Sequence, residues 1–119
     1  MVHSRDKGAR FERWVADWFR TTFGTPAHRG QQYKGGPESP DVVGAMPGVH
    51  VECKHVERLY LYKAMEQARR DAGSFIPIVI SKSNRKPVLV TVALDDLVLL
   101  ARTVVETLDA PKDGVREMA

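Results

Sequence analysis

The stretch that decides the fold is "SPDVVGAMPGVHVECKH", residues 39–55. Two apolar segments, 41–45 and 49–55, flank "AMPG", whose Pro and Gly are typical of a tight turn. A hairpin centred between Met46 and Pro47 pairs residues whose numbers add to 93, so Asp41 would face Glu52. Directly opposed residues have Cβ atoms about 5 Å apart. A β-bulge would shift this register by one residue.

Alternation along residues 49–55 separates two faces of the second strand, because successive side chains point to opposite sides. The apolar set belongs in a core and comprises Val49, Val51 and Cys53. The polar set would face a cleft and comprises His50, Glu52 and Lys54. We therefore expect Cys53 to be a small buried residue and not a nucleophile.

A helix is expected upstream, from Arg10 to Phe23, since apolar residues recur there at helical spacing. The expected apolar stripe is Phe11, Trp14, Val15, Trp18 and Phe19. Ser4 or Asp6 could cap this helix, and Gly24 with Pro26 would end it. A short strand near 27–31 and a loop, "QQYKGGPES", would lead to Asp41.

Downstream, residues 59–72 are expected to form a helix ended by Gly73. Its candidate buried positions are Leu59, Tyr62, Ala64, Met65 and Ala68. "FIPIVI" and "PVLVTVAL" suit buried strands, joined by the basic turn "SKSNRK". The sequence pattern of residues 94–108 predicts a last helix, which Asp95 or Asp96 would cap. The order α-β-β-β-α-β-β-α predicts an α/β fold, a mixed central sheet flanked by helices.

The composition sets bounds on the class of protein. A chain of 119 residues suits one domain, expected over 1–108, with a polar tail at 109–119. No apolar run is long enough to cross a bilayer, and no secretory signal is evident. A single cysteine excludes an internal disulfide and favours a cytoplasmic location without membrane attachment. The net charge of +3 permits a polyanionic partner.

The paired acids suggest a chemistry. Two carboxylates this close raise each other's pKa, and a divalent cation between them removes the repulsion. Hard oxygen ligands favour Mg²⁺ or Mn²⁺. Lys54, on the same face as Glu52, could orient a water and offset charge on a phosphoryl group. The alternative is a solvated strand face that carries an ordinary Glu–Lys pair.

The motif itself resembles a known signature. "PD", followed by "ECK", matches the PD-(D/E)xK nuclease superfamily, whose restriction-endonuclease-like core has the same element order; the matching residues are Pro40, Asp41, Glu52 and Lys54. "KGARFERWVADWF" further resembles the first helix of archaeal-type Holliday junction resolvases, where a Gly precedes a helix bearing Glu and then Arg, here Gly8, Glu12 and Arg13. Gln67 in "QARRDA" matches a Gln that these resolvases carry in the helix after the lysine-bearing strand. The resemblance covers about 7–92, and the small size would suit a phage-borne enzyme.

The resemblance implies a role for each matching residue. Asp41 and Glu52 would bind Mg²⁺, or Mn²⁺ in its place, with the Cys53 backbone carbonyl as a third ligand. Glu12 would approach the metal directly or through water. Lys54 would position the attacking water, and Gln67 would hold that water or support Lys54. Hydrolysis would leave a 5′-phosphate, with one or two metal ions per site.

Each of these assignments has a simpler alternative. Glu12 could pair with a nearby Arg, and Gln67 could lie on a solvated helix face. His50 and His55 are weak candidates, since such a histidine is more often solvated or bonded to backbone. The loop before Asp41 departs from the small Ser/Gly loop of the family, because Tyr33 and Lys34 are bulky.

Three groups of basic residues could bind DNA phosphates. They are Arg5, Lys7, Arg10 and Arg13 in the first helix, Arg29 and Lys34 around the loop, and Lys82, Arg85 and Lys86 in the basic turn. Tyr33 could stack on an opened base. Any one group alone is more often a solvated face.

The last helix is apolar on more than one stripe. Either it packs against a second copy of the chain, or it is central and buried on several sides. A homodimer would suit paired nicks in a four-way DNA junction. The expected function is therefore a dimeric Holliday junction resolvase acting on branched double-stranded DNA. The alternatives are another PD-(D/E)xK endonuclease of restriction, mismatch or flap type, an inactive DNA-binding module, or a purely structural domain.

Overall fold

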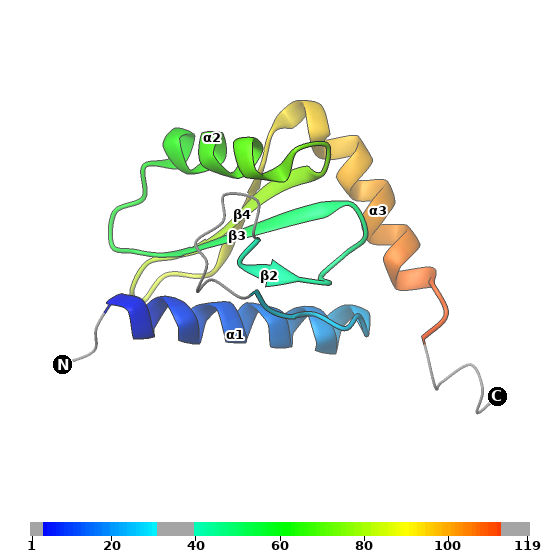
Figure 1. Cartoon of the computed structure of the whole chain (residues 1–119), viewed down its shortest axis with the longest axis horizontal. Helices are drawn as coiled ribbons and strands as arrows, with labels where there is room; N and C mark the ends of the chain where they lie inside the picture. The colour runs from blue at the N-terminus through cyan, green and yellow to red at the C-terminus, as the bar shows by residue number, and fades with distance from the viewer. Residues whose placement is uncertain (1–3, 31–39, 113–119) are drawn as a thin grey trace.

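A computed structural model describes residues 4–30 and 40–112 of the chain, and the side chains from Asp6 on (Figure 1). The helices and strands are α1 (Ser4–Phe23), β1 (His28–Arg29), β2 (Val42–Val43), β3 (Val49–His55), α2 (Leu61–Ala72), β4 (Ile76–Lys82), β5 (Leu89–Val92), a 3₁₀ turn (Leu94–Asp96) and α3 (Leu97–Asp109). This is the predicted order of elements. The predicted loop at 31–39, which holds Tyr33 and Lys34, and most of the predicted tail lie outside the described residues.

The strands form one mixed sheet in the order β1-β2-β3-β4-β5. β3 and β4 are parallel and are joined by α2, whereas the other neighbouring strands pair antiparallel. In Figure 1 the sheet lies between α1 and α2. This architecture confirms the predicted α/β class with a restriction-endonuclease-like core.

The hairpin adopts the predicted register. Val42 pairs with Val51, so partner numbers add to 93 and no bulge intervenes. The backbone N–H of Asp41 donates to the Val51 carbonyl at 2.9 Å, which extends the pairing toward Glu52. β2 is shorter than predicted, because the chain turns at Gly44, where φ is +77°.

One face of the sheet packs on α1, and Val49, Val51 and Cys53 lie in this core as predicted. Four of the buried residues of α1 follow an i, i+4 spacing, namely Phe11, Val15, Phe19 and Phe23, and Ala16 is buried beside Val15. Trp14 and Trp18 were predicted on the same stripe, but both are about half exposed. The apolar stripe of α1 is therefore wider than the face that the sheet covers.

The opposite face is covered by α2 through Ala64 and Ala68, which pack on Val79 of β4. Leu59 and Met65 are partly buried beside them, as expected. The prediction for Tyr62 is wrong, since its side chain is 87% exposed. Small alanines bring α2 close to β4, so a bulky residue on an adjacent stripe points away from the sheet.

β4 is buried as predicted, but β5 is not. Leu89 and Val90 are exposed, because β5 is the edge strand and has a neighbour on one side only. The apolar run "PVLVTVAL" therefore predicted a strand correctly, but the prediction that this strand is buried is wrong.

α3 begins after the 3₁₀ turn, and Asp96 at its start makes no side-chain capping bond in the described structure. Leu100 and Val104 pack partly on the main core, and within α3, which is described throughout, Thr107 alone is buried. The alternative of a central helix buried on several sides is therefore wrong. Neither described range, 4–30 nor 40–112, contains a helix with the length and hydropathy to cross a lipid bilayer.

Candidate active site

The acids of the hairpin meet where β2 begins, opposite the middle of β3. Asp41 immediately precedes β2 and is 8% exposed, while Glu52 on β3 is 4% exposed. Asp41 Oδ2 accepts the backbone N–H of Cys53 at 2.8 Å, which holds the Asp41 carboxylate against β3. The pairing register therefore brings these two acids together inside the protein.

The electrostatics of Glu52 follow from this placement. Burial is the main cause that raises the pKa of Glu52, and the neighbouring Asp41 carboxylate raises it further through its charge and a side-chain hydrogen bond. A hydrogen bond from His50 opposes these effects but does not reverse them. The pair is thus held under the repulsion that a cation would relieve.

His50 differs from the prediction. Its side chain is 3% exposed, and its Nε2 lies 2.8 Å from Glu52 Oε1. The expectation of a solvated or backbone-bonded histidine is therefore wrong. Alternation placed His50 and Glu52 on one face, but it carried no information on how deeply α2 and the hairpin enclose that face.

Glu12 reaches the same region from α1. Its Oε1 accepts a hydrogen bond from Arg29 Nε at 2.6 Å, which is the arginine pairing considered as an alternative. Burial raises the pKa of Glu12, with a further contribution from the charge of Asp41, whereas Arg29 opposes the shift. Glu12 therefore lies within electrostatic reach of the acid pair while it binds Arg29.

Lys54 and Gln67 also come together. Lys54 Nζ donates to Gln67 Oε1 at 3.4 Å, across the space between β3 and α2. The distance makes this a weak hydrogen bond. It nevertheless connects the lysine of the motif to the helix residue that the resemblance singled out.

Cys53 points to the other side, into the α1 core, and burial strongly raises the pKa of its thiol. A thiol that stays protonated is a poor nucleophile. The predicted burial of the Cys53 side chain is confirmed, and its raised pKa agrees with the prediction that it is not a nucleophile; its backbone carbonyl stays a predicted ligand.

The donor set suits a hard divalent cation, because two adjacent buried carboxylates offer oxygen ligands and gain from a positive charge. Within residues 4–30 and 40–112, however, no group of three or more His, Cys, Asp or Glu side chains is arranged to hold a metal. The third predicted acid, Glu12, is turned toward Arg29. Asp41 and Glu52 would hold the metal, and Glu12, whose Oε1 binds Arg29, would reach it through its second carboxylate oxygen or through water.

Two of the three predicted basic groups converge around His55, at the end of β3. Burial, then the positive charges of Lys7 and Lys82, lower the pKa of His55 at the end of β3. Arg10, Lys82 and Lys86 line a groove of about 470 Å³ beside His55 and Trp14. The N-terminal part of α1 and the β4–β5 turn thus form one basic surface.

The remaining basic residues are more dispersed. Arg13 and Arg85 are exposed, and Arg85 has a φ of +64° within the β4–β5 turn. Arg29 binds Glu12. Arg5 belongs to α1, but its side chain lies outside the described set, as do Tyr33 and Lys34. Gly8 lies inside α1 instead of preceding it, in contrast to the family pattern.

The raised pKa values predict a pH dependence of stability. Between the ordinary value of 4.5 and the raised value, the folded state binds protons more tightly than the unfolded state, so the free energy of unfolding decreases as the pH rises. We expect the melting temperature of the metal-free protein to fall as the pH rises from the ordinary value of these groups through their raised pKa values. Glu52→Gln should raise the melting temperature at the upper end and flatten this slope. Calorimetry of both proteins checks this, and an unchanged slope in the variant would contradict it.

The mixed sheet, with the Asp41–Glu52 pair across the β2–β3 hairpin and Lys54 further along β3, is the arrangement of a nuclease of the PD-(D/E)xK superfamily. Residues 3–109 match the model of the family described as "Phage putative PDDEXK endonuclease", and the chain belongs to this family. No curated protein and no solved structure matches the chain.

Proposed function

We propose that the protein is a divalent-metal-dependent endodeoxyribonuclease that cuts branched DNA, with the four-way junction as its substrate. The observation that carries the nuclease activity is the buried Asp41–Glu52 pair beside Lys54. Asp41, just before β2, and Glu52 and Lys54, on one face of β3, would supply ligands for a cation and a positive charge for the reacting phosphate.

Each residue of the candidate site would have a separate role in this reaction. Asp41 and Glu52 would hold Mg²⁺, or Mn²⁺ in its place, and the bound metal would supply Lewis-acid activation of the scissile phosphate. The Lys54 ammonium would orient the attacking water and offset negative charge on the phosphoryl oxygens. Gln67 would fix Lys54 through their hydrogen bond. In-line attack by this water would leave a 5′-phosphate and a 3′-hydroxyl.

The basic surface made by Lys7, Arg10, Lys82 and Lys86 would bind the DNA backbone. Lysine and arginine contacts to phosphates give affinity that does not depend on base sequence. Such contacts suit an enzyme that selects the shape of its substrate, because phosphates position a DNA arm without reading its bases.

The junction preference rests on the apolar surface of the domain. Exposed apolar residues of the C-terminal segment are Leu94, Leu97, Val98, Leu99, Val105 and Leu108. Trp14, Trp18 and Val90 also line a groove of about 190 Å³ on the α1 side. Apolar exposure of this extent is typical of a protein interface. A two-fold dimer would carry two active sites, as paired cuts across a junction require.

The test is cleavage of a labelled immobile four-way junction, compared with a linear duplex and a splayed fork at one salt concentration in Mg²⁺. We expect symmetric paired nicks on the junction only. Equal cutting of all three substrates would favour the second candidate, another endonuclease of the same family, to which the family match also points. Binding without cutting in Mg²⁺ or Mn²⁺ would indicate an inactive DNA-binding module.

A further inference from the structure

We propose that His50 is a positioning residue that orients the Glu52 carboxylate for metal binding. The inference rests on the proposed metal-dependent nuclease function and names a residue outside the motif. His50 precedes Glu52 by two positions on β3, so the two side chains lie on the same face of the strand. Their contact, Nε2 to Oε1, is 2.8 Å and fully buried.

The direction of this hydrogen bond follows from the chemistry. A Glu52 that binds a cation must be ionised, and an ionised carboxylate only accepts hydrogen bonds. His50 must therefore donate through an Nε2–H. Since a carboxylate offers about four acceptor positions, one bond at Oε1 leaves capacity for a cation.

Orientation matters here because a glutamate side chain has several rotatable bonds. Once Asp41 and Glu52 are both ionised, the hydrogen bond between them is lost and their charges repel, so a Glu52 without another partner would turn away from Asp41. The bond to His50 holds one carboxylate oxygen and limits this rotation. Hydrogen bonds to metal-binding side chains act in this way in many proteins, and their loss costs about 10–100-fold in metal affinity.

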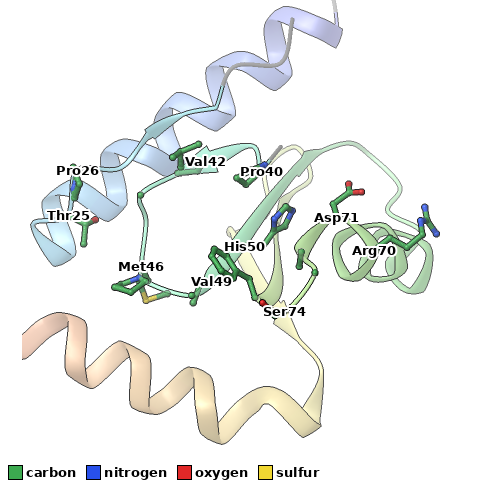
Figure 2. A pocket seen from close by; sticks show the side chains of 17 residues that line it. Thr25, Pro26, Pro40, Val42, Met46, Val49, His50, Arg70, Asp71 and Ser74 are labelled. Carbon is green, nitrogen blue, oxygen red and sulfur yellow. The ribbon is translucent and has the colours of Figure 1, made fainter. Parts of the chain in front are cut away.

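The surroundings of His50 allow the idea to be tested without rebuilding the core. His50 lines a groove of about 730 Å³ between the β2–β3 hairpin and the C-terminal end of α2. Figure 2 shows the ring between Pro40, on the hairpin side, and Asp71 of α2. A side chain of similar size at position 50 has this space in which to adjust.

The experiment measures Mn²⁺ binding to the DNA-free protein by calorimetry and electron paramagnetic resonance. His50→Leu removes the donor, whereas His50→Gln keeps an N–H at the position of Nε2. We expect H50L to weaken Mn²⁺ binding about 10–100-fold and H50Q to recover most of that loss. His28→Leu is the matched control, since His28 is exposed on β1, and it should bind Mn²⁺ like the wild type.

The outcomes separate this inference from the proposed function. If the wild type binds Mn²⁺ and cuts DNA while H50L binds Mn²⁺ equally well, the role of His50 is wrong and the nuclease stands. If H50Q is as weak as H50L, donation by residue 50 is not the cause and the inference also fails. A wild type without Mn²⁺ affinity would overturn both proposals. His50→Phe, which keeps a planar ring, replaces H50L if the leucine variant does not fold.

Discussion

Replacing Asp41 with asparagine is expected to lower the rate of DNA cleavage by at least about 10³-fold, because a metal contributes several kcal/mol of charge stabilisation in the transition state. Asparagine keeps an oxygen that can accept the N–H of Cys53, so the hairpin should stay paired. The charge that attracts the cation is lost. Single-turnover cleavage at saturating protein measures the effect, and chelation of the metal should abolish wild-type cleavage as well.

The matched control for this substitution is Asp17→Asn. Asp17 is exposed on α1 and pairs only at the surface with Arg20, at 3.0 Å. Its replacement should leave cleavage unchanged, since surface ion pairs contribute little to stability. Wild-type cleavage by a folded D41N protein would mean that Asp41 is not a metal ligand.

Of the glycine-to-alanine substitutions considered, Gly30→Ala should destabilise the protein most. The N–H of Gly30 donates to the carbonyl of Asp41 at 2.8 Å, and a Cβ at position 30 would overlap the carbonyl oxygen of Pro40. Both neighbours are backbone groups, so the chain itself must move. We expect a loss of about 2–3 kcal/mol in the free energy of unfolding. Urea unfolding measures this loss, and cleavage should fall with it because Asp41 is displaced.

Gly8→Ala gives the opposite result and serves as the control. Position 8 is inside α1, and among the described residues no atom beyond its chain neighbours and the local helix backbone lies within 4 Å of a Cβ there. Alanine in a helix should stabilise the protein by about 0.5–1 kcal/mol. If the G30A protein unfolds at the same urea concentration as the wild type, the close approach between Gly30 and Pro40 is not essential to the fold.

Much of the candidate site could be predicted because it depends on local rules. The period of two in a strand places Glu52 and Lys54 on one face. The position of the turn sets the register that brings Asp41 opposite Glu52. Both features lie within 17 consecutive residues, so no distant part of the chain was needed to infer them.

Other features depend on which surfaces meet, and the sequence carried little information on this. The partner of Glu12 is Arg29, 17 residues away, and their approach depends on how α1 crosses β1. Tyr62 and the β5 residues Leu89 and Val90 had apolar patterns that suggested burial. The exposure of Tyr62 follows from the packing of α2 on β4 through Ala64 and Ala68, and that of Leu89 and Val90 from the edge position of β5.

By itself the sequence determined the order of the helices and strands, the hairpin register and the face on which the acids lie, because alternation, turn residues and helical spacing act over a few neighbouring residues. Only the tertiary structure decided that His50 is buried against Glu52, that Glu12 binds Arg29 and that α3 leaves an apolar face uncovered. A pattern shows the direction in which a side chain points from its own strand or helix. What it then meets depends on the packing of segments far apart in the chain.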